Sequence, residues 1–233
     1  WEAPENTRMA FRRAVDLGYR YLETDVRATS DGVPVIFHDS SLDRTTSIRG
    51  TISDLPWRHV RSARIHGRQP IMQLTDLLEE FPDTRFNLDL KEPNAIDPFV
   101  TVVRRMNAWD RIVIGAFSQE RLTRARRLGG PRLATSLSPQ EVFRLWLAAR
   151  GRGGRYRPPP ARCVQVPPSA GGRTIVEPRL LALAHGIGWQ VHVWTIDSAA
   201  QMEELIDVGV DGLMTDRPTL LRQVLRQRGL WQE

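Results

Sequence analysis

The chain has 233 residues, of which 41% are hydrophobic and 26% are charged. This composition suffices for a large buried core, excludes wholesale disorder and leaves no apolar run long enough to cross a membrane. The net charge of +6 and the isoelectric point near 10.5 favour anionic partners such as phosphate esters or acidic lipids. The basic residues are dispersed and accompany no recognition motif, so we expect no nucleic acid partner.

The first half of the chain alternates helical patterns with short apolar runs. A segment that includes Pro56 and Trp57 breaks this alternation and predicts an irregular insertion around residues 40–70. The predicted elements are a helix at 6–17 that ends at Gly18, a strand at 19–26, an extended run at 33–37, a helix at 75–80, a strand at 86–91, a helix at 98–107, a strand at 111–117 and a helix at 119–128.

The second half continues the same alternation. Ser138-Pro139-Gln140-Glu141 is a capping box with proline at the first helical position, which predicts a helix start. The arginine, glycine and proline residues around 150–162 predict a flexible surface loop. The remaining predicted strands are 133–137, 163–166, 190–196 and 210–215, and the remaining helices are 177–184, 198–208 and 218–228.

Repeated strand–helix units predict an α/β fold with a parallel sheet. A (β/α)8 TIM barrel fits this length as a single domain over residues 1–233, and no glycine-rich dinucleotide loop supports a doubly wound sheet. Seven parallel strands and the run at 33–37 are predicted. We therefore expect the first barrel strand to lie upstream of residue 1.

Two predicted strands carry charged residues on one face. Alternation puts Glu23 and Asp25 on the same side of the first strand, and Asp89 and Lys91 on the same side of the strand at 86–91. The three carboxylates predict an all-oxygen site for a hard cation, Mg²⁺ or Ca²⁺. The alternatives are a solvent-facing polar strand and a structural Asp89–Lys91 ion pair.

Three further residues bear on the chemistry. Lys91 is the only lysine among 33 basic residues, which indicates a role for a compact charge at a phosphate or a developing oxyanion. His38 ends an apolar run beside Asp39, so it is a candidate general acid or base, with a structural histidine as the alternative. Cys163 is the single cysteine, which excludes an internal disulfide and a cysteine-rich zinc site.

Eight motifs occur in an order and spacing that resemble the glycerophosphodiester phosphodiesterase family, and the likeness covers nearly the whole chain. They are Pro4-Glu5-Asn6-Thr7, Glu23-Thr24-Asp25-Val26, Thr29-Ser30-Asp31-Gly32, His38-Asp39, Leu42-Asp43-Arg44-Thr45-Thr46, Asp89-Leu90-Lys91, Val193-Trp194-Thr195 and Gly209-Val210-Asp211-Gly212-Leu213-Met214-Thr215-Asp216-Arg217-Pro218.

The resemblance implies a TIM-barrel hydrolase of lipid and glycerol metabolism. Its expected substrates are small glycerophosphodiesters, such as glycerophosphocholine, and its products glycerol 3-phosphate and an alcohol. The implied roles are metal binding for Glu23, Asp25 and Asp89, phosphate binding for Lys91, and protonation of the leaving alcohol for His38. The resemblance also implies that Phe117 and Trp194 line the apolar side of the glycerol pocket, with core packing as the alternative.

Two departures from the family pattern stand out. The family's His-Arg-Gly motif should lie just before Pro4, and Asp89 stands where the family usually has glutamate. The alternative functions are a lysophospholipase D of the same family and a non-catalytic module that binds head groups. We expect a cytoplasmic protein, with a secreted or membrane-associated location as the alternative. The sequence leaves the oligomeric state open.

Overall fold

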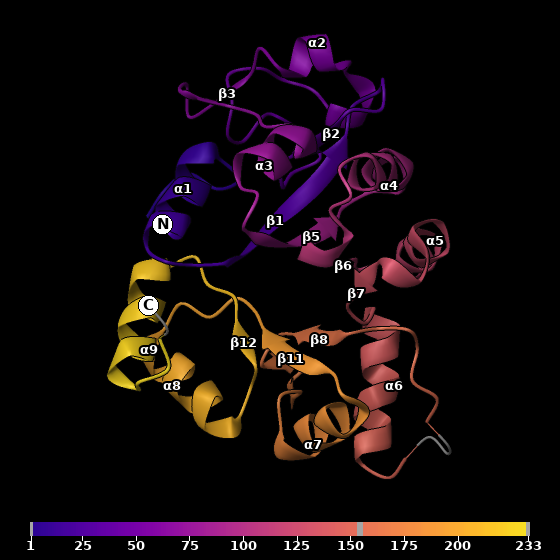
Figure 1. The fold of residues 1–233 in the computed structure, drawn as a ribbon, viewed down its shortest axis with the longest axis vertical. Coiled ribbons are helices and arrows are strands. Elements are labelled where there is room, and N and C mark those ends of the chain that lie inside the picture. The colour runs from indigo at the N-terminus through magenta and orange to yellow at the C-terminus, as the bar shows by residue number, and fades with distance from the viewer. Residues whose placement is uncertain (1, 153–155, 232–233) are drawn as a thin grey trace. The chain divides into compact units, whose positions relative to one another are not determined.

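The computed structural model describes residues 2–152 and 156–231. Its internal contacts divide the chain into an N-terminal unit, Ala3–Ala134, and a C-terminal unit that holds the other described residues. Both units alternate strands with helices (Figure 1). Residues 153–155 of the loop predicted around 150–162 lie outside the described residues, and the rest of that loop contains neither helix nor strand. The single-domain organisation stays a prediction.

The N-terminal unit has a sheet in the order β2-β1-β5-β6. β1 pairs in parallel with β5, β5 pairs in parallel with β6, and the short β2 runs antiparallel to β1. Its elements are α1 (Arg8–Asp16), β1 (Tyr21–Ala28), β2 (Pro34–Ile36), η1 (Ile52–Asp54), α2 (Trp57–Val60), β3 (Arg64–Ile65), β4 (Gln69–Pro70), α3 (Leu74–Glu80), β5 (Arg85–Leu90), η2 (Pro93–Ala95), α4 (Ile96–Arg105), η3 (Trp109–Arg111), β6 (Ile112–Gly115), α5 (Gln119–Gly129) and η4 (Gly130–Arg132).

The C-terminal unit has a parallel sheet in the order β12-β11-β8 and a small β9–β10 hairpin. The capping box predicted at Ser138 starts α6: the Ser138 hydroxyl accepts from the Glu141 amide, and the Glu141 carboxylate accepts from the Ser138 amide. The elements from the unit boundary onward are β7 (Ala134–Thr135), α6 (Pro139–Ala149), β8 (Cys163–Val166), β9 (Ser169–Ala170), β10 (Arg173–Thr174), α7 (Pro178–Ile187), β11 (Gln190–Val193), α8 (Ala199–Val208), β12 (Gly212–Leu213) and α9 (Pro218–Gln227).

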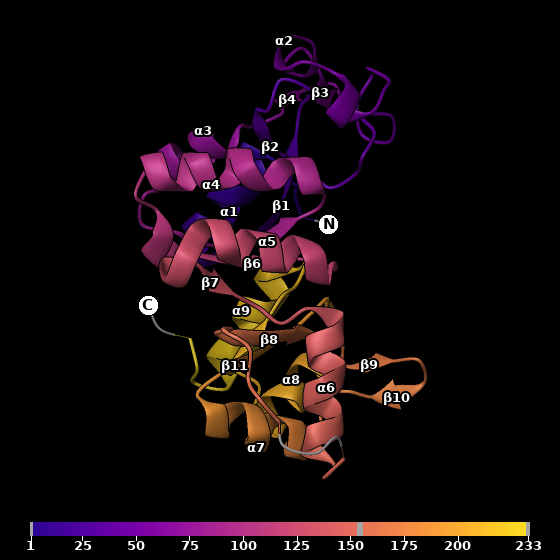
Figure 2. The same cartoon turned by 90° about the vertical axis from the view of Figure 1, so that its right-hand side faces the viewer.

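The core of the N-terminal unit lies between its sheet and its helices. Phe86, Leu88 and Leu90 alternate along β5 and are at most 1% exposed, as the period-two pattern predicts. α4 and α5 run side by side across this unit (Figure 2). The opposite face of β5 carries Asn87 and Asp89, which are partly buried. The strand therefore separates an apolar core from a polar face.

Residues 40–70, which were expected to be irregular, contain the short elements η1, α2, β3 and β4. They enclose an apolar cluster of their own, which is separate from the main core. Its buried members are Val35, Phe37, Leu42, Ile52, Val60, Ala63, Ile65 and Ile71. The segment after β2 is thus held by hydrophobic burial as well as by turns.

β1 begins and ends two residues later than the predicted strand at 19–26. Arg27 therefore belongs to the strand and shares the face of Glu23 and Asp25. The register with β5 places Asp25 opposite Asp89. In the part of the chain that the structure describes, no helix is long and apolar enough to span a bilayer.

Candidate active site

Asp25, Asp89 and Lys91 meet on the polar face of β1 and β5. The Lys91 Nζ atom lies 2.9 Å from Asp25 Oδ1 and 2.8 Å from Asp89 Oδ2. Burial alone would lower the pKa of Lys91, but the two carboxylate charges outweigh it and the pKa is raised. Lys91 is therefore a cation at neutral pH, and it compensates two acidic groups that are largely withdrawn from water.

Asn6 orients the second oxygen of Asp25. Its side-chain amide donates to Asp25 Oδ2 over 2.9 Å, and its carbonyl oxygen accepts from the Thr24 hydroxyl over 2.5 Å. Thr24 is fully buried and Asp25 is 7% exposed. The Asn6 backbone has a φ of 55°, a left-handed conformation that asparagine tolerates better than most residues. Both oxygens of Asp25 are thus held in place.

His38, Asp39, Arg44 and Glu5 form a second polar chain after β2. His38 Nδ1 lies 2.7 Å from Asp39 Oδ1, and Arg44 Nε donates to Asp39 Oδ2 over 2.5 Å. Arg44 Nη2 also donates to Glu5 Oε1. The hydrogen bond from Arg44, assisted by His38, lowers the pKa of Asp39 to about 2. The side chain of His38 is 54% exposed, so its ring can reach a ligand.

Arg27 holds the backbone carbonyl group of His38 in place. Arg27 Nε donates to the His38 carbonyl oxygen over 2.9 Å, and Arg27 Nη1 donates to Glu92 Oε2 over 3.2 Å. Glu92 follows Lys91 directly and also accepts from the Ala28 amide. The end of β1, the loop that bears His38 and the turn after β5 are therefore joined by one arginine and one glutamate.

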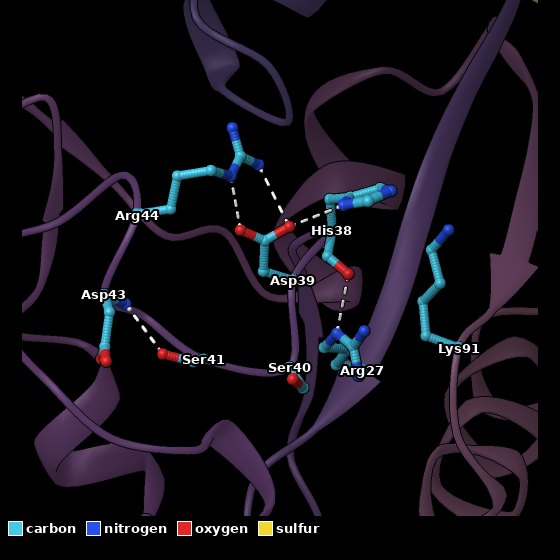
Figure 3. A pocket seen from close by; sticks show the side chains of 8 residues that line it. All are labelled: Arg27, His38, Asp39, Ser40, Ser41, Asp43, Arg44 and Lys91. Carbon is cyan, nitrogen blue, oxygen red and sulfur yellow. Dashed lines mark hydrogen bonds and ion pairs between the residues drawn. The ribbon is translucent and has the colours of Figure 1, made fainter.

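Some of these residues line a cavity of about 480 Å³. Figure 3 shows Lys91 on one side of His38 and the Asp39–Arg44 pair on the other. The cavity is lined by eight polar residues: Arg27, His38, Asp39, Ser40, Ser41, Asp43, Arg44 and Lys91. A cavity with a net positive lining and a histidine at its wall suits an anionic ligand that undergoes proton transfer.

The other predicted site residues take different positions. Glu23 is exposed and lies opposite Asn87 in the β1–β5 register. Phe117 follows β6 and is 60% exposed, so core packing does not describe it. Trp194 follows β11 in the C-terminal unit and is partly buried. The roles predicted for these three residues stay predictions.

Carboxylate oxygens such as those of Glu23, Asp25 and Asp89 are the ligands that a hard divalent cation prefers, but the structure does not bring one oxygen of each within 4.8 Å of the others. Asp89 Oδ1 is buried and has no hydrogen-bond partner among the described residues, so it offers an unused acceptor beside Asp25. A second group of potential ligands also exists, because one atom each of Glu5, His38 and Asp39 lie within 4.8 Å of one another. The Arg44 guanidinium already bonds both carboxylates of that second group, which makes it the poorer cation site.

The roles of Asn6, Arg27, Asp39 and Arg44 were not predicted from the sequence. Asn6 and Arg44 stand in motifs that carry the family resemblance, which marks them as candidates without indicating their partners. Their partners lie far away in sequence: Asn6 bonds Asp25 at a separation of 19 residues. Only the folded backbone brings such pairs together.

Comparisons with known proteins bear on the family and the fold of this chain. The model of the glycerophosphoryl diester phosphodiesterase family matches residues 2–220. A relative from Mycobacterium tuberculosis, named "Probable glycerophosphodiester phosphodiesterase 2", is 45% identical, and the match covers 98% of this chain and 88% of that protein.

Two solved structures bear on the fold. A glycerophosphodiester phosphodiesterase from Agrobacterium tumefaciens superposes with a TM-score of 0.77 at 23% identity, covering 96% of this chain and 94% of the other. A phosphodiesterase from Oleispira antarctica, in complex with the product sn-glycerol-3-phosphate, gives a TM-score of 0.77 at 21% identity, with 96% and 92% covered. The predicted α/β TIM-barrel class is confirmed, and with the family-model match and the 45% identical relative these findings show that the chain belongs to the glycerophosphoryl diester phosphodiesterase family.

Proposed function

We propose that this protein hydrolyses glycerophosphodiesters, including glycerophosphocholine, to glycerol 3-phosphate and an alcohol. The observation that carries the proposal is the cavity that His38 and Lys91 line together, beside the carboxylates of Asp25 and Asp89. It offers a proton donor, a fixed positive charge and acidic metal ligands. Phosphodiester hydrolysis uses all three, since the leaving oxygen needs a proton and the phosphoryl oxygens carry negative charge.

In this proposal, Glu23, Asp25 and Asp89 hold a divalent cation, Mg²⁺ or Ca²⁺. When bound, such a cation polarises the phosphoryl oxygens and stabilises the charge that develops on them. Asp89 Oδ1, which has no hydrogen-bond partner within the described part of the chain, supports this assignment. Asp89 is one methylene shorter than the glutamate usual in the family, so the position of the cation depends on how closely β1 approaches β5.

Lys91 binds the phosphate and His38 acts as the general acid. An ammonium group has three N–H donors, and the bonds to Asp25 and Asp89 leave one for a phosphoryl oxygen. His38 Nε2 is the ring nitrogen that is not bonded to Asp39, and it donates its proton to the oxygen of the leaving alcohol. We also propose Phe117 and Trp194 as contacts of the glycerol moiety, each testable by its own alanine variant.

The test measures glycerol 3-phosphate released from glycerophosphocholine with Mg²⁺ or Ca²⁺, and with a chelator as control. We expect chelator-sensitive release by the unmodified protein. His38→Gln should lower kcat by about 10²–10⁴-fold, which is the usual contribution of a positioned acid. The matched control is His59→Gln, an exposed histidine of α2, which should leave turnover unchanged.

Each arm can fail separately. Binding of glycerophosphocholine without release of product would favour the non-catalytic module. Release that a chelator does not affect would contradict the metal assignment. Equal turnover by His38→Gln and the unmodified protein would contradict the role of His38 and leave the reaction itself standing.

A further inference from the structure

The guanidinium of Arg44 forms an extensive set of bonds in the site but has no role in the proposed reaction so far. It bonds two carboxylates from distant parts of the N-terminal unit: Asp39, five residues earlier, and Glu5, thirty-nine residues earlier. Its contact with Asp39 uses two nitrogens, since Nε reaches Oδ2 at 2.5 Å and Nη2 reaches Oδ1 at 3.1 Å. Such a bidentate pair fixes the plane of a carboxylate as well as its charge.

Asp39 Oδ1, which Arg44 contacts only through Nη2, is also the oxygen that contacts His38. Asp39 Oδ1 lies 2.7 Å from His38 Nδ1. The pKa of Asp39 is lowered to about 2, chiefly by the hydrogen bond from Arg44, so this carboxylate only accepts hydrogen bonds at neutral pH. His38 must then carry a proton on Nδ1. Figure 3 shows the other ring nitrogen, Nε2, on the side of His38 that faces Lys91.

We propose that Arg44 is a positioning residue for His38, acting through Asp39: it holds the carboxylate that orients the imidazole and directs Nε2 to the leaving alcohol. The inference rests on the proposed function, in which His38 is the general acid. Arg44 touches neither substrate nor cation in this assignment. Its effect is to hold the imidazolium in one orientation, with Nδ1–H directed to Asp39 and Nε2–H to the leaving alcohol, as the carboxylate of a catalytic triad orients its histidine.

The partner on the other side of Arg44 extends the argument. Glu5 directly precedes Asn6, which donates to Asp25 over 2.9 Å. Glu5 and Asn6 thus connect two parts of the site. Glu5 bonds Arg44, which holds Asp39 and the proposed acid His38, and Asn6 bonds Asp25, a proposed metal ligand. Arg44 therefore fixes the position of His38 relative to Asp25, one of the proposed metal-binding carboxylates, in addition to orienting its ring.

Several other charged groups face His38, and none of them replaces Arg44. Arg27 donates to the backbone carbonyl oxygen of His38, which does not orient the imidazole ring. Lys91 and Asp43 line the same cavity, where Lys91 bonds Asp25 and Asp89, and the carboxylate of Asp43 accepts from the Gly50 amide. The imidazole ring itself is bonded by Asp39.

In the step that Arg44 supports, water forms a bond to phosphorus and the bond from phosphorus to the alcohol oxygen breaks. That oxygen keeps the bonding electron pair and takes the proton from His38 Nε2. The proton that water loses returns to His38 through solvent. A diester monoanion and water thus give a monoester monoanion and an alcohol.

The test compares two substrates whose leaving groups differ in their need for a proton. Choline, the leaving alcohol of glycerophosphocholine, needs one, whereas the nitrophenolate of glycerol 3-(4-nitrophenyl phosphate) leaves without one. Arg44→Met should lower kcat for glycerophosphocholine about 100-fold, with little change in KM, and lower kcat for the nitrophenyl substrate by less than about threefold. Arg44→Lys should recover part of the loss, because it restores the charge without the fork.

Two controls accompany these variants. Arg68→Met removes an exposed arginine from the turn between β3 and β4 and should change neither substrate's kcat. Nitrogen-15 NMR of the neutral imidazole reads the tautomer without any turnover. His38 should carry its proton on Nδ1 in the unmodified protein and mainly on Nε2 in Arg44→Met.

Equal losses of kcat on both substrates would reduce Arg44 to a structural residue and overturn the proposal, as would an unmodified protein with the proton on Nε2. If the unmodified protein hydrolyses neither substrate, the proposed function fails, and the tautomer measurement still decides whether Arg44 positions His38.

Discussion

Replacing Asn6 by alanine should destabilise the protein far more than a typical surface substitution. The change removes the donor to Asp25 Oδ2 and the acceptor of the Thr24 hydroxyl. It also places alanine at a φ of 55°, which alanine adopts less readily than asparagine. Three separate contributions therefore act in the same direction.

The size of the effect follows from the burial of the partners. A hydrogen bond to a charged group contributes about 1.5–3 kcal/mol, and a hydroxyl left unsatisfied in a buried position costs about 1–3 kcal/mol. Thr24 is fully buried and Asp25 is 7% exposed, so water replaces neither contact readily. Left-handed backbone adds about 1 kcal/mol for alanine. The expected loss for Asn6→Ala is about 4 kcal/mol.

Urea denaturation measures this loss as a shift of the midpoint at unchanged slope. Asn107→Ala is the matched control, because Asn107 has a φ of 50° but is exposed, and the described bond of its side chain is to the exposed Arg132. That control should lose about 1 kcal/mol, the backbone contribution alone. Asn6→Gly should lose about 3 kcal/mol, since glycine accepts the backbone conformation and lacks the side chain. Equal losses for Asn6→Ala and Asn107→Ala would refute the role given to the side chain.

Two further predictions concern buried ionisable groups. Lys91→Met leaves Asp25 and Asp89 without the ammonium group that they share, so it should abolish turnover. It should also lower the free energy of unfolding, measured in urea, by about 3 kcal/mol. Added Mg²⁺ should reduce this loss of stability, and a loss that Mg²⁺ does not change would argue against a cation site at these carboxylates. Burial raises the pKa of the Cys163 thiol to about 12 from an ordinary value of 9.0. The unfolded chain therefore loses this proton at lower pH than the folded protein, and stability should fall above pH 9 by at most about 1.4 kcal/mol per pH unit. Cys163→Ala should lack this part of the alkaline slope, and identical slopes for the two proteins would contradict it.

The parallel strands were predictable because their signals are local. The apolar alternation of Phe86, Leu88 and Leu90 and the polar alternation of Glu23 and Asp25 each lie within one strand, where a period of two residues fixes the face. The same signal predicted that Asp89 and Lys91 share a face. The face of each strand could therefore be predicted from the sequence, and with it the two strands whose aspartates, Asp25 and Asp89, lie opposite each other.

The interactions that hold the site were not predictable in this way. The bonds of Asn6 to Asp25 and of Arg44 to Glu5 join residues 19 and 39 positions apart, and no periodicity connects them. The start of β1 at Tyr21 also differs from the predicted start at residue 19, since the first residues after Gly18 satisfy the end of α1: the Tyr19 amide donates to the Ala14 carbonyl oxygen. Such choices depend on tertiary packing.

The separate apolar cluster beneath residues 40–70 has a consequence for how this enzyme family can diversify. Leu42 and Ile52 are fully buried in it, so the segment keeps its shape through its own packing. Ser40, Ser41 and Asp43 belong to the same segment and line the cavity together with His38. Their side chains can therefore be exchanged without repacking the main core. Variation at these three positions would change the cavity wall and leave the apolar packing of the segment as it is.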